Sequence, residues 1–344
     1  MVRHAREALS TQPSVIAAAL LVLALTGVLH AQGALKLATV VPQGSVWDKN
    51  LKQMGEEWKE ATAGRVSVTV YSGASQGDEQ TVLRKIRLDA LQAAAFTAVG
   101  LGSIDSAFNV FDIPFFFDSY DELNYVTDKL TPVLRKRIEP KGFMFLNWGH
   151  GGWTQVFTKK PVQTVDDLKH VKLWTSAGND RMVQWFKANG FEPRAMAMTD
   201  ILTGLTTGML EGLPTTPLAA MLFQWDRQTP YMLELGLAPI VGADVMSMKA
   251  WKAIPDADKP KLLAAAAGVE QRLRLEVPKL DADAVAQMTK RGLTVTKPTG
   301  SEWRTELNGL AKTMRGETVP ADIFDLASKA RDEFRKQKNA PPRK

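Results

Sequence analysis

One turn of the chain has residue types and spacing that could perform hydrolysis. Residues 73–77 read Gly-Ala-Ser-Gln-Gly, which matches the G-x-S-x-G turn that presents a nucleophilic serine, here Ser75, between a strand and a helix. Residues 150–152, His-Gly-Gly, resemble a loop that stabilises an oxyanion. The order in the chain argues against this chemistry. In hydrolases of that type the oxyanion loop precedes the serine and the histidine comes last, whereas here Ser75 comes early and the last histidine is His170.

Tryptophans near the ends of short apolar runs favour a binding pocket instead. Trp148 follows the run at 143–146, Trp153 follows a glycine-rich turn, and Trp174 ends the run at 171–174. Ligands of open α/β sheets sit at strand ends, so these side chains are candidates for a pocket wall. An indole offers a broad apolar face and a single donor, which suits ring-shaped or cationic ligands.

The remaining composition gives no support to metal, cofactor or nucleic-acid chemistry. Only His150 and His170 follow the first 31 residues, and the sequence holds no cysteine, no HExxH, no calcium loop and no dinucleotide or phosphate loop. The 43 basic and 37 acidic residues give a net charge of +6 without a long basic run that also holds aromatic residues. We therefore expect no metal, no cofactor and no nucleic-acid partner, and a binding protein rather than an enzyme.

Residues 1–31 have the features of a secretory signal peptide. Arg3 and Arg6 make a positive start, an apolar run covers 15–29, and Ala31 is a small residue suited to cleavage. That run is shorter than the roughly 20 residues of a spanning helix, although an uncleaved membrane anchor is the alternative. Either way the remainder is exported, and without cysteine it can form neither disulfides nor a lipid anchor. We expect a bacterial periplasmic protein.

The elements after this segment alternate between strand and helix. Apolar alternation and helical spacing predict strands at 34–41, 66–71 and 93–99, with helices at 45–61 and from 78 to about 88. This β-α-β-α-β order is typical of a doubly wound α/β domain. The length of 344 residues favours two domains, and the glycines at 149–152 provide a hinge. Long helices are expected at 256–286 and 302–314.

Three segments in this order resemble the solute-binding proteins of TRAP transporters, the DctP family. They are FNVFDIPFFFDSYDEL at 108–123, KPVQTVDDLKHVKLW at 160–174 and GMLEGLPTTP at 208–217. The likeness covers nearly the whole chain after the signal. It implies a two-domain α/β periplasmic-binding-protein fold with a hinged interdomain ligand cleft and long C-terminal helices. It also implies that a small organic solute is delivered to TRAP membrane permease subunits that a sodium gradient drives.

The resemblance and the element order together predict the domain boundaries. Domain I takes 32–148 plus about 240–280, domain II takes 149–239 plus about 281–325, and 326–344 is a basic flexible tail. The oligomeric state stays open between monomer and dimer.

The family typically binds a carboxylate with an arginine at the end of the strand that here reads 171–174, and often with a second arginine past the hinge. Trp174 and Trp153 stand at those positions. An indole lacks both the charge and the planar fork of donors that holds a carboxylate. We therefore expect a solute that is aromatic, cyclic or otherwise less anionic than a dicarboxylate. The alternative is that both tryptophans pack the core and that Arg181 or Arg194 binds an acid.

Further pocket residues are expected at strand ends and at positions that the family uses. Thr215 and Thr216 stand where the family often has an amide, and Met198 where it often stacks a side chain on the ligand. The expected ligand-binding residues are Gln43, Trp47, Phe96, Thr97, Trp153, Trp174, Thr175, Ser176, Arg181, Met198, Thr215 and Thr216. We expect a pocket with more apolar wall and less charge than in the relatives.

Overall fold

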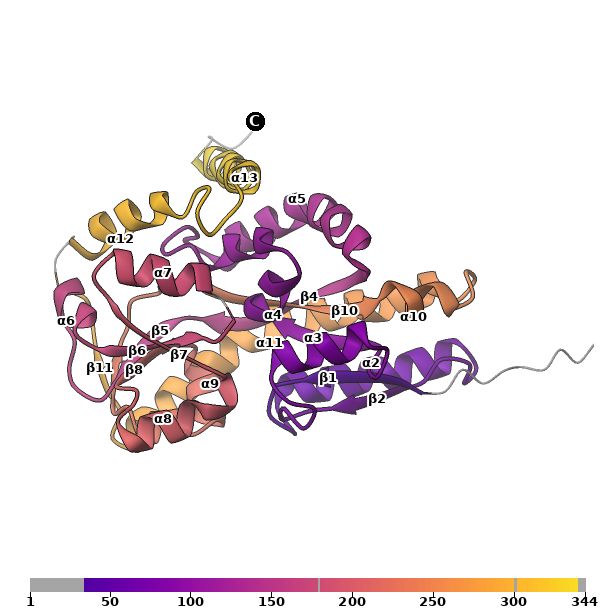
Figure 1. Ribbon diagram of the computed structural model, residues 1–344, viewed down its shortest axis with the longest axis horizontal. Helices are drawn as coiled ribbons and strands as arrows, with labels where there is room; N and C mark the ends of the chain where they lie inside the picture. The colour runs from indigo at the N-terminus through magenta and orange to yellow at the C-terminus, as the bar shows by residue number, and fades with distance from the viewer. Residues whose placement is uncertain (1–33, 179, 300–301, 340–344) are drawn as a thin grey trace, which may run out of the picture.

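The computed structural model describes residues 34–178, 180–299 and 302–339. Two β-sheets lie side by side with helices on their faces, which gives the α/β architecture expected from the sequence (Figure 1). The expected signal peptide at 1–31 lies outside the described residues. Among the helices of the described ranges, none has both the length and the hydropathy of a membrane span.

The first sheet has the strand order β2-β1-β3-β10-β4, in which the first three strands are parallel and β10 is antiparallel to both of its neighbours. The helices that connect its early strands begin at capping side chains, because Ser45 and Asp78 each accept a hydrogen bond from a first-turn amide. The elements are β1 (Leu35–Thr39), α2 (Val46–Ala61), β2 (Val68–Tyr71), α3 (Glu79–Arg87), β3 (Ala93–Thr97), α4 (Ala98–Ile104), η1 (Ser106–Asp112), α5 (Tyr120–Ile138), η2 (Glu139–Lys141), β4 (Phe143–Trp153) and β10 (Pro239–Ser247).

The second sheet has the strand order β11-β9-β5-β8-β6-β7. Its helix α6 begins at a reciprocal cap, in which Thr164 and Asp167 each accept a hydrogen bond from the other's backbone amide. The elements are β5 (Gln155–Thr158), α6 (Val165–Lys169), β6 (Lys172–Ser176), α7 (Asp180–Ala188), β7 (Glu192–Met196), η3 (Met198–Asp200), α8 (Ile201–Thr207), β8 (Gly212–Thr215), α9 (Pro217–Leu222), η4 (Trp225–Arg227), β9 (Tyr231–Leu233) and β11 (Thr294–Thr296).

Strands β4 and β10 and the long helix α11 (Lys259–Lys290), which follows α10 (Met248–Ala253), run from one sheet region to the other (Figure 1). Asp281 of α11 accepts hydrogen bonds from the amides of Trp153 at 3.1 Å and Leu218 at 2.8 Å, so it ties the end of β4 to the start of α9. Gly152 lies against this carboxylate with φ +102°, and a Cβ there would be only 2.6 Å from Asp281 Oδ2. The glycines expected to provide a hinge lie at the end of β4, where close packing requires glycine at position 152, and the hinge itself stays a prediction.

The aromatic segment at 108–117 is core. Phe108, Phe111 and Ile113 are fully buried, and Trp148 packs among the aromatic rings, with its ring centre 5.1 Å from that of Phe111. The Trp148 Nε1 donates to Thr131 Oγ1 at 2.8 Å, so its polar edge is also satisfied inside the protein. Trp148 is thus a core residue rather than the pocket wall that its position suggested.

The C-terminal helices α12 (Glu302–Thr313) and α13 (Ala321–Asn339) lie over different parts of the molecule (Figure 1). Trp303 of α12 is buried against the second sheet region and donates to the Gln163 carbonyl at 2.7 Å, whereas α13 packs along α5. Residues 326–339, which we expected to belong to a flexible tail, are helical here. The reason is an apolar stripe on α13, with Ile323, Ala327 and Ala330 buried at helical spacing.

Candidate ligand cavity

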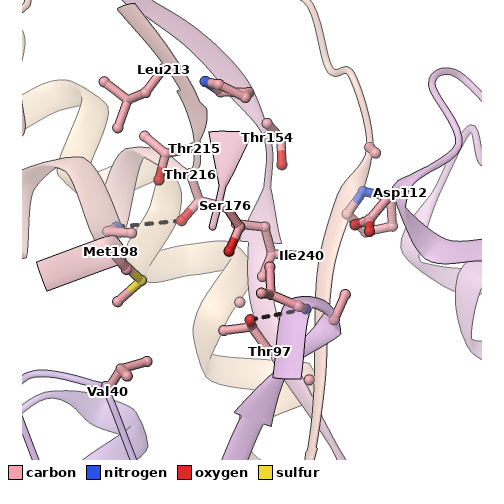
Figure 2. Close-up of a pocket in the computed structure, with 18 of the residues that line it drawn as sticks. Val40, Thr97, Asp112, Thr154, Ser176, Met198, Leu213, Thr215, Thr216 and Ile240 are labelled. Atoms are coloured by element: carbon pink, nitrogen blue, oxygen red, sulfur yellow. Dashed lines mark hydrogen bonds between the residues drawn. The ribbon is translucent and has the colours of Figure 1, made fainter. Parts of the chain in front are cut away.

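A cavity of about 330 Å³ lies between the two sheets. This volume is within the range of small-molecule sites, roughly 300–1,000 Å³. Its walls come from the strand ends and first helical turns of both sheets, and Figure 2 shows the hydroxyl groups of Thr97, Thr154 and Ser176 among the side chains around it.

The wall from the first sheet includes Trp47, Phe96 and Thr97, three of the residues expected to bind the ligand, and that contact stays a prediction. Trp47 lies in the first turn of α2, and its Nε1 donates to the His150 carbonyl at 2.7 Å. Since that bond occupies the only polar atom of the indole, Trp47 can offer a ligand its apolar face alone. Phe96 and Thr97 end β3, which places both at the same edge of the sheet.

The wall from the second sheet includes Trp174, Thr175, Ser176, Met198, Thr215 and Thr216. Strands β6 and β8 are parallel, so the residues at their carboxyl ends meet at one edge of the sheet. The Trp174 Nε1 donates to the Met196 carbonyl at 3.1 Å, which again leaves the face of the ring for a ligand. Thr216 caps α9 by accepting from the Ala219 amide at 3.3 Å.

Three of the expected site residues lie outside the cavity lining. Gln43 is exposed after β1. Trp153 packs edge-on against Tyr120, with ring centres 5.3 Å apart. Arg181 is exposed, and its Nη1 donates to the Glu317 carbonyl at 3.5 Å, whereas Arg194 lies beside Glu192 on the surface. Within the described ranges, the lining contains no arginine or lysine.

The ionisable side chains that line the cavity are three acids and one histidine. Glu79 is fully paired, because it accepts hydrogen bonds from Thr97 N, Thr97 Oγ1 and Gly100 N, although burial still raises its pKa. Burial, aided by the nearby charge of Arg274, lowers the pKa of His150 to about 4, so this imidazole is neutral at physiological pH.

Asp112 and Asp244 are the acids that protein donors leave incompletely paired. Burial raises the pKa of Asp244 to about 7, and its Oδ2 has no hydrogen-bond partner within the described structure. Burial also raises the pKa of Asp112 to about 7. No hydrogen bond or ion pair to the Asp112 carboxylate occurs among the described residues, and this half-buried side chain lines the cavity.

Sequence reasoning missed Asp112 and the apolar end of the cavity. Asp112 is the single acid in the apolar run at 108–117, and that isolation was the one available signal. Trp185 and Phe186 of α7 and Leu307 of α12 also line the cavity, but no strand end or family position indicated them. The Trp185 Nε1 donates to Thr313 Oγ1 at 2.6 Å.

The residues that matched a hydrolase turn are not brought together. Ser75 is exposed between β2 and α3 and does not line the cavity. His150 is buried in β4, and His170 lies on the surface 3.9 Å from Asp166. In the part of the chain described, no group of three or more His, Cys, Asp or Glu side chains is arranged to hold a metal ion.

Comparison with known proteins defines the class as extracellular solute-binding receptors. The family model "Bacterial extracellular solute-binding protein, family 7", DctP, matches residues 37–317, and the chain belongs to this family. The resemblance to the solute-binding proteins of TRAP transporters is thereby confirmed, and so is the two-domain α/β fold. The family consists of substrate-binding receptors.

Two curated relatives illustrate the range of the match. A "Solute-binding protein" of Chromohalobacter salexigens is 31% identical over 166 residues, which cover 48% of this chain and only about half, 49%, of the relative. The "Sialic acid-binding periplasmic protein SiaP" of Vibrio cholerae is 23% identical over 324 residues, 91% of this chain and 98% of the relative.

Solved structures show the same fold at low identity. A TRAP periplasmic solute-binding protein from Xanthobacter autotrophicus, with bound β-D-galacturonate, has a TM-score of 0.80 at 17% identity and covers 87% of this chain and 99% of its own. A Bordetella pertussis receptor that binds pyroglutamic acid, DctP7, has a TM-score of 0.79 at 20% identity with the same coverage.

Proposed function

We propose that this protein is the periplasmic receptor of a TRAP transporter, exported by the segment at 1–31. It captures a small organic solute in the cavity between its two sheets and delivers the solute to membrane permease subunits. Membership of the family supports the receptor role, and the cavity supplies the site.

The single observation that carries the ligand class is the absence of any arginine or lysine from the described cavity lining. Trp174 lies in this lining, at the position where the family is expected to hold a carboxylate with arginine. An indole whose Nε1 already donates to the Met196 carbonyl presents no charge and no free donor. The solute is therefore aromatic, cyclic or otherwise less anionic than a dicarboxylate, and it lies against the faces of Trp47 and Trp174.

The geometry gives less support to the two alternatives. A carboxylate bound through Arg181 or Arg194 would need an exposed side chain to leave its surface partner and enter the cavity. Hydrolysis at Ser75 would need a base, but among the described residues no histidine bonds this exposed hydroxyl. We therefore infer a binding role without catalysis.

A ligand screen with two matched tryptophan variants tests the proposal. Thermal unfolding of the purified protein is measured with neutral rings, aromatic amines, sugar acids and dicarboxylates. A ligand at about 100 times its dissociation constant should add roughly 2.7 kcal/mol of stability. Trp174→Ala should weaken binding, whereas Trp153→Ala should not, because both side chains are half-buried but only Trp174 lines the cavity.

Two results would contradict the proposal. Stabilisation by dicarboxylates or sugar acids alone would show that another cation enters the cavity. Equal losses in the two variants would show that Trp174 has no contact with the ligand.

A further inference from the structure

We propose that the solute carries a protonated amine and that the carboxylate of Asp112 binds it. The inference rests on the proposed function, namely that the cavity between the sheets is the solute site. It also specifies the charge of the solute. The absence of the carboxylate-binding arginines does not by itself define that charge.

The first support is the position of Asp112. It is the last residue of η1, and Figure 2 shows it on the opposite side of the pocket from Met198 and Thr216, with Ser176 and Ile240 between them. Within the described structure the protein gives its carboxylate no hydrogen bond and no ion pair, and the half-buried side chain lines the cavity. A ligand that donates hydrogen bonds can therefore pair with it.

The second support is the sign of the charges around the cavity. The lining acids are Glu79, Asp112 and Asp244, and the described lining holds no basic side chain to oppose them. Glu79 is already paired by three donors of the protein, so it stabilises the fold rather than a ligand. His150 is neutral, because burial lowers its pKa to about 4. Wherever these acids are ionised they favour a cationic solute over an anionic one, and the described lining offers an anion no positive side chain.

The third support is the way in which the tryptophans are held. The indole N–H groups of Trp47, Trp174 and Trp185 all donate to protein acceptors. None of the three can therefore donate to a carboxylate of the solute, and the lining presents aromatic faces. Such faces attract cations through the ring quadrupole, so they reinforce the choice of an amine.

Burial alone raises the pKa of Asp112 to about 7, without a contribution from a neighbouring charge. In the empty protein the carboxyl group is thus partly protonated at neutral pH, and binding of an ammonium group must release that proton. Below pH 7 the apparent affinity should consequently fall about tenfold for each pH unit. This profile distinguishes an amine paired with Asp112 from one held by aromatic faces alone.

The test uses calorimetric titration of the purified protein with compounds that share a ring and differ in one group. The probes are phenethylamine, 2-phenylethanol and 3-phenylpropionate, together with the cyclohexyl analogues of each. We expect the amines to bind at least tenfold more tightly than the alcohols, and the acids not to bind. Asp112→Asn should weaken the amines tenfold or more, remove their pH profile and leave the alcohols unchanged. Asp283→Asn, on an exposed site of α11, is the matched control and should change nothing.

Each other outcome overturns the inference. If the alcohols bind as tightly as the amines, or if Asp112→Asn leaves amine binding and its pH profile intact, Asp112 is not the anchor, whereas the proposed neutral, ring-binding site survives. If no amine binds at millimolar concentration, the inference also fails. If the acids bind best, it fails together with the proposed ligand class.

Discussion

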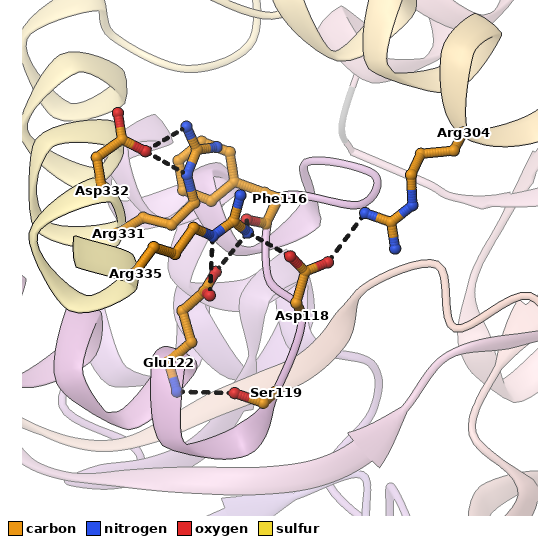
Figure 3. Close-up of polar contacts among 8 residues, drawn as sticks. All are labelled: Phe116, Asp118, Ser119, Glu122, Arg304, Arg331, Asp332 and Arg335. Carbon is orange, nitrogen blue, oxygen red and sulfur yellow. Dashed lines mark hydrogen bonds and ion pairs between the residues drawn. The ribbon is translucent and has the colours of Figure 1, made fainter. Parts of the chain in front are cut away.

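Arg335 should be the side chain that holds helix α13 against the body of the molecule. Its guanidinium donates to the Glu122 carboxylate through two bonds, Nε to Oε2 at 3.0 Å and Nη2 to Oε1 at 2.8 Å, and it also lies 2.8 Å from Asp118 (Figure 3). The Glu122 side chain is only 3% exposed, whereas that of Arg335 is 37% exposed. Replacement of Arg335 by alanine would thus leave a buried carboxylate without its cation.

The two exposures set the size of the effect. Removal of one partner from a fully buried ion pair costs about 3–5 kcal/mol. Because more than a third of Arg335 is exposed, water can partly replace it, and we discount the loss to about 1–3 kcal/mol. Glu122→Gln removes the charge that needs pairing, so the double variant should recover about 1 kcal/mol relative to the sum of the single changes.

Urea unfolding of the four proteins in this cycle measures the coupling. Arg304→Ala is the control, because Arg304 also pairs with Asp118, at 2.9 Å, but is 60% exposed (Figure 3). Its loss should change stability by less than about 1 kcal/mol. If Arg335→Ala lowers the unfolding free energy no more than Arg304→Ala does, the bidentate pair does not stabilise α13. The same conclusion follows if the losses of unfolding free energy from Arg335→Ala and Glu122→Gln are additive in the double variant.

Three further changes have expected outcomes. Gly152→Ala should lower the unfolding free energy by about 2–4 kcal/mol, since its Cβ would meet Asp281, whereas Gly142→Ala, at φ +89° in open space, should cost about 1 kcal/mol in the same urea titration. Trp58→Ala should cost about 3–5 kcal/mol by that measurement, because the ring is fully buried and its Nε1 bond to the Leu262 carbonyl is lost. Asp112→Asn should raise the melting temperature of the empty protein more at pH 8 than at pH 4. The pKa of Asp112 in the folded protein, about 7, exceeds the unfolded value of 3.8, so the wild-type protein loses stability as the pH rises between these two values. An equal gain in melting temperature at pH 4 and pH 8 would refute this.

Much of the fold follows from local pattern. The alternation in 66–71 and the helical spacing in 45–61 each depend only on neighbouring residues, and the structure contains β2 and α2 within those ranges. The same logic located most of the expected cavity residues. Trp174 and Ser176 lie two residues apart in the carboxyl-terminal part of β6, and Thr215 ends the parallel strand β8, so their proximity follows from the sheet itself.

Trp153 shows where such reasoning stops. Strand side chains alternate between faces only while the register is regular, and the pairing of β4 with β10 shifts between Ile240 and Val241. Gly151 is the extra residue there, since Ile240 pairs with Gly152 and Val241 with His150. An extra residue reverses which face each later side chain occupies. The direction of Trp153 therefore depends on a bulge that the sequence pattern does not reveal.

The helical structure of residues 326–339 was missed for a related reason. The basic residues of 335–344 suggested a solvated tail, but order there depends on a partner far away in sequence. Arg335 pairs with Glu122, which lies 213 positions earlier in the sequence. The small apolar stripe of Ala327 and Ala330 stabilises the helix only because α13 packs against α5, which buries it. Charge composition alone cannot distinguish a solvated arginine from one that pairs with a buried acid.

The position of Asp112 links the choice of solute to the function of a two-domain receptor. Its carboxylate belongs to the first sheet's side of the cavity, whereas the face of Trp174 belongs to the second. A solute whose amine pairs with Asp112 while its ring lies on this indole contacts both sides at once. Its full binding energy is then available only when the two sides are close together, so binding favours that arrangement. Asp112, whose pKa is raised by burial, is thus the group through which the proposed solute would stabilise the loaded protein.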